Sequence, residues 1–250
     1  LKSISNQKFE VPYEIVFIDD HSTDDSVAIA HRYGCKVIPL DRKFTYGYAL
    51  NFGIQHCSYD IILLLSSHNI LLSNDFSSKL LQYFEDEKVA GVRCTPIANA
   101  KQIEQSLYEV VKLTEENYNH SKDWSNLLVA NCSAIRKSVA EQIPFQETIR
   151  SNEEKLWCLE VLKSGYTIYS NVPCYFIYNK KSNVDAVIRD TISKFQIDGI
   201  APTPTATFLI TIFKSIPWAM KIALGIWYPS MKAKYYTFLI PFQHKKGDYK

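Results

Sequence analysis

Glycine is scarce in this sequence, at 8 of 250 residues, and no glycine-rich turn follows any of the early strand-like segments. Such a turn lets a dinucleotide pyrophosphate approach the backbone at the start of a helix, so its absence disfavours a Rossmann-type oxidoreductase. Net charge is almost absent too, at +2, so no overall basic field argues for a nucleic-acid partner. These two absences point away from nicotinamide chemistry and from nucleic-acid binding.

Short cysteine spacings are also missing. The six cysteines are scattered without a Cys-x-x-Cys pair, and each lies in an apolar segment. This distribution favours buried, reduced thiols in a cytoplasmic protein over disulfides or a zinc site. The N-terminal residues do not resemble a signal peptide, and the first residue is Leu rather than Met, which is consistent with missing upstream sequence.

Long uncharged hydrophobic runs, which a spanning helix requires over about 20 residues, are lacking as well. Residues 208–228 are strongly apolar, but Lys214, Pro217 and Lys221 interrupt them. Lysines beside aromatic residues suit an interfacial helix better than a spanning one. A helical lid packed on the domain explains the pattern equally well. Peripheral contact with the inner face of the plasma membrane is therefore one of two interpretations.

The sequence does contain a clear alternation of strand-like and helix-like segments, and its length can bury one sizeable core with a smaller appendage. Strands are predicted at 13–18, 36–40, 59–65, 89–94, 127–133, 166–171 and 174–178, and helices at 26–33, 46–55, 76–84, 102–118, 153–164 and 183–197. Strands separated by helical stretches imply right-handed crossovers and a mainly parallel sheet. We therefore predict an α/β domain that ends near residue 180.

Polar residues follow two of the buried strands. The first strand is followed by Asp19 and Asp20, and the strand at 59–65 by Ser66 and His68. Ligands of open α/β sheets bind in the crevice beyond the carboxyl ends of strands, so these two strand ends should face the same crevice. Acids there can accept hydrogen bonds from a base or ribose, and a histidine can ligate a metal or donate to a phosphate. The alternative is a polar strand-to-helix turn and a structural histidine.

A third candidate element is the helix that begins within RSNEEKLWCLEVLKSGY, residues 150–166. Its first turn carries Glu153 and Glu154. Acids are common there because the helix dipole favours negative charge, so a purely structural role is one interpretation. The functional hypothesis is that one carboxylate projects into the crevice and takes a proton from an attacking hydroxyl as a general base.

In their order along the chain, these elements resemble the family-2 glycosyltransferases of the GT-A fold. The resemblance rests on YEIVFIDDHSTDDS, on FTYGYALNFGIQHCSYDIILLLSSHNILLSNDF and on FQETIRSNEEKLWCLEVLKSGYTIYSNVPCYFIYN. The most similar sub-group is the bacterial rhamnosyltransferase-like enzymes, which often have Ser-x-His in place of Asp-x-Asp. The resemblance implies a GT-A α/β domain with a mixed, helix-flanked sheet over 1–182, from which the family's first strand is missing, and a C-terminal helical extension over 183–250.

The resemblance also implies a role for each candidate residue. Asp20, with Asp19, binds the nucleotide; Ser66 and His68 hold the donor diphosphate and a divalent cation, Mg²⁺ or Mn²⁺; Glu154 is the catalytic base; Glu153 and Trp157 shape the acceptor pocket; and Tyr178 falls where the family often has a metal-binding His. Trp157 is just as readily a core residue, because it lies on a helix face. Tyr48 stands where the sub-group often shows an Arg.

The implied activity is transfer of a hexosyl or rhamnosyl-type sugar, with inversion, from a nucleotide-diphospho-sugar to a hydroxyl of a glycan or lipid-linked acceptor. The implied setting is bacterial surface polysaccharide synthesis. Ser, His and Tyr are poorer ligands for Mg²⁺ and Mn²⁺ than carboxylates, since these cations prefer hard oxygen donors. This departure favours a competing hypothesis, in which the chain is a catalytically weak or inactive relative that binds glycans or a partner enzyme.

Overall fold

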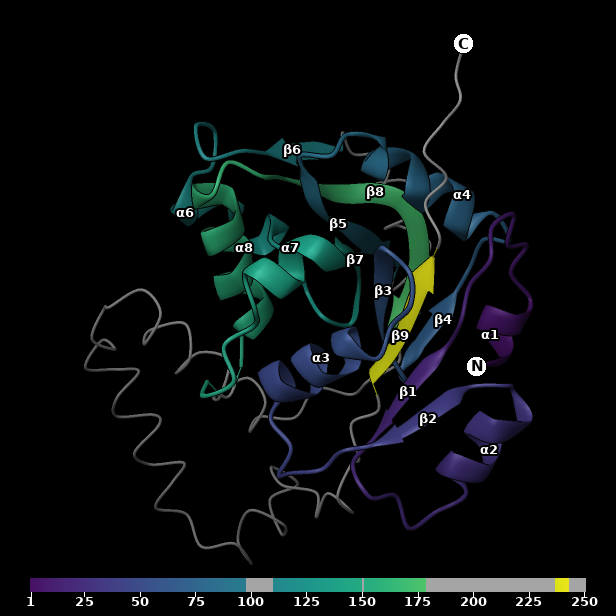
Figure 1. Cartoon of the computed structure of the whole chain (residues 1–250). Helices are drawn as coiled ribbons and strands as arrows, with labels where there is room; N and C mark the ends of the chain where they lie inside the picture. The colour runs from purple at the N-terminus through teal and green to yellow at the C-terminus, as the bar shows by residue number, and fades with distance from the viewer. Residues whose placement is uncertain (98–109, 150, 179–236, 243–250) are drawn as a thin grey trace, which may run out of the picture.

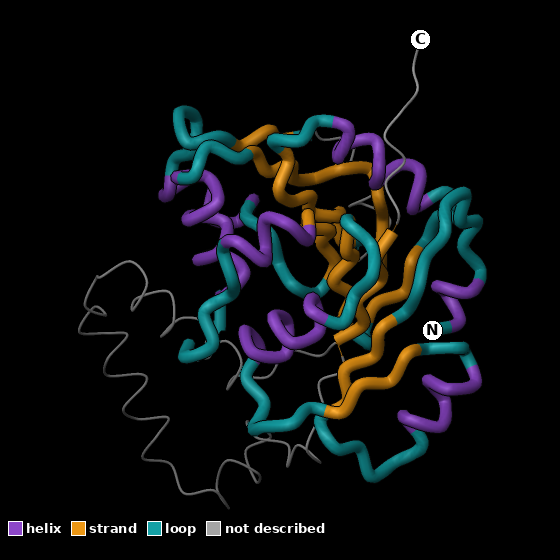
Figure 2. The backbone as a smooth tube through the Cα atoms, viewed as in Figure 1, coloured by secondary structure: helices purple, strands orange, loops and turns teal. Residues whose placement is uncertain are grey.

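The computed structural model describes residues 1–97, 110–149, 151–178 and 237–242. Within these ranges a single sheet runs through the molecule, and helices lie on both of its faces (Figures 1 and 2). Its strands are β1 (Val16–Asp19), β2 (Lys36–Pro39), β3 (Ile61–Ser66), β4 (Asn69–Leu71), β5 (Val89–Pro96), β6 (Val111–Leu113), β7 (Cys132–Arg136), β8 (Thr167–Tyr178) and β9 (Thr237–Phe242). The order across the sheet is β2-β1-β9-β3-β7-β5-β8-β4, and β6 pairs with β8 outside this path.

The sheet is mixed, as the resemblance implies, and not mainly parallel, as the strand–helix alternation predicts. β1 with β2 and β5 with β8 are parallel pairs, whereas β3 with β7 and β7 with β5 are antiparallel. The mainly parallel prediction is wrong because β7 returns between β3 and β5 in the opposite direction. Because β7 is antiparallel to both β3 and β5, these two strands run in the same direction. Their carboxyl ends therefore lie at one edge of the sheet.

Strand β9 lies between β1 and β3 and is antiparallel to both (Figure 1, yellow). Thr237 is opposite Ile18 on one side and Ser66 on the other. Among the described strands, β9 joins the β1–β2 pair to the rest of the sheet. Residues 237–242 fall within the predicted helical extension but form a strand, and the other residues of 183–250 lie outside the described ranges.

Two groups of helices cover the two faces of the sheet (Figure 1). The helices are α1 (Lys2–Ser5), α2 (Ser26–Arg32), α3 (Tyr46–Gln55), α4 (Phe76–Leu81), α6 (His120–Asp123), α7 (Lys137–Gln142) and α8 (Glu153–Lys163), with 3₁₀ turns η1 (Gln82–Glu85) and η2 (Trp124–Asn126). Ile62 and Leu64 pack in the core with α3, α7 and α8, and Leu63 packs in a second core with α1, α2 and α4. Both faces of β3 are covered, which explains its uninterrupted apolar run.

Local sequence signals set the ends of the two helices nearest the candidate site. Thr45 caps α3, since its hydroxyl accepts a hydrogen bond from the backbone N–H of Tyr48 at 3.2 Å. Gly165 follows α8 with a φ of 81°, a left-handed conformation that glycine adopts without steric cost. The predicted helices at 46–55 and 153–164 are therefore confirmed almost to the residue.

Four other predicted elements are corrected by the structure. Within the predicted helix 102–118, residues 111–113 form β6 and 98–109 lie outside the described ranges. The predicted strand 127–133 begins only at Cys132, because Leu127 and Leu128 are buried under α8 as irregular chain. The two strands predicted at 166–171 and 174–178 are one strand, β8, in which Asn171 has a φ of 58°.

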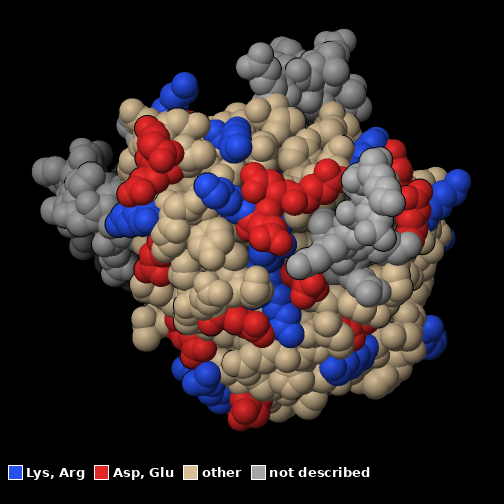
Figure 3. All heavy atoms as spheres, turned by 45° about the horizontal axis from the view of Figure 1, so that its top comes forward, with Lys and Arg blue, Asp and Glu red and all other residues tan. Residues whose placement is uncertain are grey.

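Other sequence predictions concern the whole chain. All six cysteines are buried and free, as predicted. In the part of the chain that the structure describes, no helix has the length and apolar character needed to cross a membrane. On the face shown in Figure 3, basic and acidic side chains are interspersed, in line with the small net charge.

Candidate active site

The strand ends that the sequence predicts to face one crevice lie at one edge of the sheet, where β1, β3 and β5 end. β1 and β3 point the same way because each is antiparallel to β9, and β3 and β5 do so because each is antiparallel to β7. Asp20 follows β1, and Ser66 is the last residue of β3. Since Ile18 and Ser66 face the same residue of β9, these strand ends lie two strand spacings apart, about 10 Å. The structure thus brings the first two candidate elements to one edge.

The two adjacent aspartates have different environments. Asp19 is 6% exposed, and its carboxylate accepts hydrogen bonds from the backbone N–H of Ser22 at 3.1 Å and from the Ser22 hydroxyl. Asp20 is half-buried, and no hydrogen bond to its carboxylate occurs among the described residues. His21 then reverses the chain with a φ of 52°. Asp19 therefore stabilises the turn toward α2, and Asp20 is the carboxylate that remains for a ligand.

The Ser66–His68 turn connects β3 to β4. The hydroxyl of Ser66 accepts a hydrogen bond from the backbone N–H of His68 at 3.4 Å, so the turn is closed locally. The ring of His68 lies edge-on to that of Tyr178, with 6.2 Å between the centroids, because Asn69 on β4 is opposite Tyr178 on β8. The structure therefore brings together Ser66 and His68, which the sequence predicts at the diphosphate and its metal, and Tyr178, which it predicts at the metal alone.

The acids of α8 also differ from one another. Glu153 is 3% exposed, whereas Glu154 is half-buried. Asn152, which precedes them, has a left-handed φ of 64° and turns the chain sharply into the helix. The partly exposed carboxylate is the one that a substrate hydroxyl can approach, so the structure favours Glu154 over Glu153 for the proposed base.

Trp157 belongs to the core of the domain. It is 1% exposed, its ring stacks on Phe145 with 5.2 Å between centroids, and its indole N–H donates to the carbonyl of Ile143 at 2.6 Å. Its polar group is therefore satisfied inside the protein. The predicted role in lining the acceptor pocket does not fit this burial. Trp157 shapes the site only by fixing where α8 lies.

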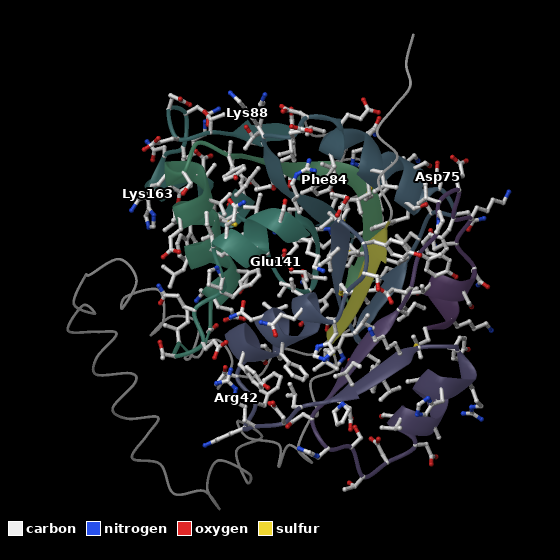
Figure 4. The ribbon with its side chains drawn as sticks, viewed as in Figure 1. Arg42, Asp75, Phe84, Lys88, Glu141 and Lys163 are labelled. Atoms are coloured by element: carbon white, nitrogen blue, oxygen red, sulfur yellow. The ribbon has the colours of Figure 1, made fainter. Side chains whose placement is uncertain are left out.

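An arginine does lie beside Tyr48, although it comes from another part of the sequence. The Arg42 guanidinium is 3.7 Å from the centroid of the Tyr48 ring, and its Nη2 is 3.0 Å from Oε2 of Glu147. Figure 4 shows Arg42 near the start of α3. Hydrogen bonding to Tyr48 raises the pKa of Arg42, and desolvation raises the pKa of Tyr48. Sequence position 48 alone does not reveal this contact.

Arg93 is a second basic residue that the sequence analysis misses. It lies on β5 opposite Ser133 of β7, and Ser133 is opposite Leu64 of β3. Arg93 therefore sits two strand spacings, about 10 Å, from the strand that ends in Ser66. Burial lowers the pKa of Arg93, and the Glu154 carboxylate acts in the opposite direction. A single cation within an otherwise apolar strand forms no recognisable motif.

Comparison with known proteins places this chain in a family. Residues 1–143, more than half of the chain, match the family model of Glycosyl transferase family 2. The chain belongs to this family. It is 22% identical over 204 residues to the dolichyl N-acetyl-alpha-D-glucosaminyl phosphate 3-beta-D-2,3-diacetamido-2,3-dideoxy-beta-D-glucuronosyltransferase of Methanococcus voltae. That match covers 75% of this chain and 64% of the relative, so the chain spans less than two thirds of the relative's length.

Solved structures share the fold. The mannosyltransferase PcManGT from Pyrobaculum calidifontis, in complex with GDP-Man and Mn²⁺, matches with a TM-score of 0.61 and 16% identity, over 91% of this chain and 76% of its own. S. aureus TarS 1–349 in complex with UDP matches with a TM-score of 0.52 and 17% identity, over 78% and 60%. At these identities the likeness shows the fold alone, and it confirms the predicted GT-A architecture.

The described residues of this family member do not fit the divalent cation that the family implies. Among them, no group of three or more His, Cys, Asp and Glu side chains is close enough to hold a metal ion. The residues at the expected position are Ser66, His68 and Tyr178, which offer hydroxyl, imidazole and phenol donors. Mg²⁺ and Mn²⁺ prefer carboxylate, carbonyl and water oxygens. We therefore assign no catalytic step to a metal here.

Proposed function

We propose that this chain transfers a sugar from a nucleotide-diphospho-sugar to a hydroxyl group of a glycan or lipid-linked acceptor. One observation supports the proposal most directly. In this family-2 domain, the half-buried Asp20 and the Ser66–His68 turn lie at the same edge of the sheet, on either side of β9. The resemblance supports the third component, Glu154 at the start of α8. Together these residues offer a nucleoside contact, a diphosphate contact and a base.

In this proposal the donor lies along the carboxyl edge of the sheet. Asp20 accepts hydrogen bonds from the ribose or base, since its carboxylate has no hydrogen bond within the described chain. Ser66 and His68, about 10 Å away across β9, donate to the diphosphate. Negative charge grows on the diphosphate as the sugar leaves, and donors held in place by a closed turn stabilise that charge most effectively.

Transfer proceeds by direct displacement at the anomeric carbon, with inversion. The acceptor oxygen forms the new bond to this carbon as the bond to the diphosphate oxygen breaks, and the electron pair leaves on the diphosphate. The acceptor proton passes to Glu154, which acts as the general base. A Glu has one methylene more than the Asp that the family usually carries, so positioning by the start of α8 is important for rate.

The finer assignments follow from the family and from sequence. A hexosyl or rhamnosyl donor is proposed from the resemblance to the rhamnosyltransferase-like sub-group. A lipid-linked acceptor is supported by the relative from M. voltae, whose name specifies a dolichyl-linked sugar phosphate. An acceptor of this kind fits synthesis of a surface polysaccharide at the inner face of the plasma membrane. The apolar, lysine-interrupted segment 208–228 supports contact with that membrane, although it lies outside the described residues.

The test is a screen of nucleotide sugars for product release, combined with calorimetric titration of UDP and GDP. We expect one nucleoside diphosphate to bind and its sugar conjugate to be consumed. Glu154→Gln is expected to keep nucleotide affinity while the turnover rate falls at least 100-fold, because only the base is lost. Glu153→Gln is the matched control for the neighbouring carboxylate. Absence of nucleotide binding in a full-length protein would overturn the proposal.

A second candidate function is a binding module without efficient catalysis. The Ser, His and Tyr donor set at the diphosphate position favours it, because the carboxylates that bind a cation in the usual motif are replaced. Such a module binds glycans or a partner enzyme and turns over no nucleotide sugar. Saccharide binding with no nucleotide binding and no transfer would support this second function.

A further inference from the structure

Arg93 lies on the face of the sheet that α8 covers. Its neighbours Val92 and Cys94 both pack into the core on the opposite face, with α1, α2 and α4. Because side chains alternate along a strand, Arg93 faces the α3, α7 and α8 side. Arg93 is half-buried. Through Ser133 of β7 it is level with Leu64 of β3, two residues before Ser66. Arg93 therefore lies on the same face of the sheet as α8, whose first turn carries Glu154.

The η2 turn contacts both Arg93 and the first turn of α8. Nη1 of Arg93 donates a hydrogen bond to the carbonyl of Ser125, while the ammonium of Lys155 lies 4.7 Å from the centroid of the Trp124 ring. Trp124 and Ser125 are consecutive, so one short turn contacts both the β5 arginine and the first turn of α8. The proposed base Glu154 precedes Lys155 in the same first turn of α8.

The hydrogen bonds of Arg93 are incomplete. Its Nε is buried without an acceptor, and no ion pair joins its guanidinium to a carboxylate among the described residues. A buried donor without a partner costs free energy, and a guanidinium removed from water costs more. An anion that reaches the partly exposed guanidinium supplies an acceptor that the described chain does not. A guanidinium also presents a planar set of donors that matches a phosphate or carboxylate.

We propose that Arg93 binds an anionic substituent, phosphate or carboxylate, of the acceptor saccharide. The inference rests on the proposed function, because it adds the charge of the acceptor to the proposed transfer. An anion at Arg93 places the remainder of the acceptor next to the first turn of α8, where Glu154 can reach its hydroxyl. The enzyme then discriminates against neutral saccharides, since they leave the guanidinium without an acceptor.

The inference is tested on the full chain by titrating matched pairs of saccharides. N-acetylglucosamine 1-phosphate is compared with N-acetylglucosamine, and glucuronate with glucose, so that a phosphate and a carboxylate are distinguished. The wild-type protein is expected to bind one anionic member at least 10-fold more tightly than its neutral counterpart. Arg93→Gln is expected to abolish this preference, and Arg93→Lys to keep part of it. Arg32→Gln, which removes the same charge from the exposed surface of α2, leaves the preference unchanged.

Nucleotide titrations keep the two proposals apart. Arg93→Gln is expected to bind UDP or GDP as the wild type does, which also shows that the variant is folded. The inference is overturned by equal binding of the charged and neutral saccharides, by no saccharide binding, or by a preference that survives Arg93→Gln. Failure of the wild type to bind any nucleoside diphosphate sinks the proposed transfer instead, and the saccharide pairs still decide the role of Arg93. If Arg93→Gln does not fold, the comparison of charged and neutral saccharides is made with the wild type and with Arg93→Lys instead.

Discussion

Thr237 of β9 lies directly opposite Ser66, the last residue of β3. On its other side it is opposite Ile18 of β1. One strand from the far C-terminal region therefore separates the candidate nucleotide contact from the candidate diphosphate contact. Because neighbouring strands are about 4.8 Å apart, β9 sets the width of the donor site. The chemistry at one edge of the sheet thus depends on residues distant in sequence.

A proline within β9 is expected to disrupt this arrangement. Leu239 is flanked by Val16 on β1 and by Leu64 on β3, so Leu239→Pro removes a backbone donor where partners lie on both sides. Each carbonyl left without its donor costs about 1–3 kcal/mol. We expect the free energy of unfolding to fall by at least that amount, and affinity for UDP or GDP to fall with it. Urea denaturation and calorimetry measure the two effects.

Pro241 provides the matched control. It lies beyond the last residue of β9 that pairs with β1, so only β3, through Ile62, flanks it. A residue without an N–H is tolerated at such a position. Pro241→Ala is therefore expected to change the free energy of unfolding by less than about 1 kcal/mol. Wild-type stability and nucleotide affinity in Leu239→Pro would show that β9 does not determine the site.

The two aspartates after β1 are expected to differ on substitution. Asp19→Asn weakens a charge-assisted acceptor for Ser22, so we expect a loss of about 1–2 kcal/mol in the free energy of unfolding. Asp20→Asn breaks no hydrogen bond within the described chain, so stability is unchanged while affinity for UDP or GDP falls about 10-fold. Chemical denaturation and calorimetry separate the two effects.

Asp25→Asn controls for the loss of one negative charge. Asp25 is exposed and makes no side-chain capping hydrogen bond at the start of α2. The free energy of unfolding and the affinity for UDP or GDP should therefore stay at wild-type values. The assignment fails if Asp19→Asn weakens nucleotide binding without loss of stability while Asp20→Asn does the reverse. Ser22→Ala is expected to reproduce the stability loss of Asp19→Asn, because it removes the hydroxyl at the other end of the same interaction.

Local patterns predict much of the domain because most of its elements are defined by short-range signals. The apolar run of β3, the cap at Thr45 and the stop at Gly165 each specify their own element. β9 could not be predicted in this way, since its pairing joins residues more than 170 positions apart, and Pro241 argues against a central strand. Its place in the sheet follows only from the tertiary fold.

The candidate site shows the same division. Asp20 and Ser66 follow buried strands, so the sequence predicts that they share an edge, and the structure agrees. The sequence cannot separate Asp19 from Asp20, because the difference lies in the hydrogen bonds of one turn. It also cannot find Arg93, whose position depends on the return of β7 between β3 and β5. Residues placed by long-range pairing need the structure.

Buried thiols are expected to make the protein less stable at alkaline pH. Burial raises the pKa of Cys57 to about 12, above its ordinary value of 9.0, and raises the pKa of Cys158 further. Between pH 9 and the raised pKa values, the folded chain keeps thiol protons that the unfolded chain has lost. The contribution of these thiols to the free energy of unfolding is therefore complete below pH 9 and is lost as the pH rises. Each thiol contributes about 1.4 kcal/mol per pH unit within that window.

Urea denaturation from pH 8 to pH 10.5 measures this slope. Cys57→Ala is expected to have a shallower alkaline slope than the wild type by the contribution of one thiol, although it loses some stability at every pH. Lys163→Gln, which removes an exposed ammonium from the last turn of α8, keeps the slope that the thiols cause. An identical alkaline slope in Cys57→Ala and the wild type would show that this thiol is not protected by the fold.

Removal of divalent cations is expected to leave donor binding unchanged. Ser66, His68 and Tyr178 offer no carboxylate, and Mg²⁺ and Mn²⁺ bind such a set weakly. Affinity for UDP or GDP, measured by calorimetry, should therefore be the same within about twofold in EDTA and in Mn²⁺.

The double variant Ser66→Asp/His68→Asp supplies two hard oxygen ligands at the end of β3 and is expected to bind the nucleotide more tightly when Mn²⁺ is present. Ser67→Asp adds a carboxylate at the exposed residue between them and should not create this dependence. A loss of more than 10-fold in wild-type affinity on adding EDTA would mean that the chain holds a cation through other residues.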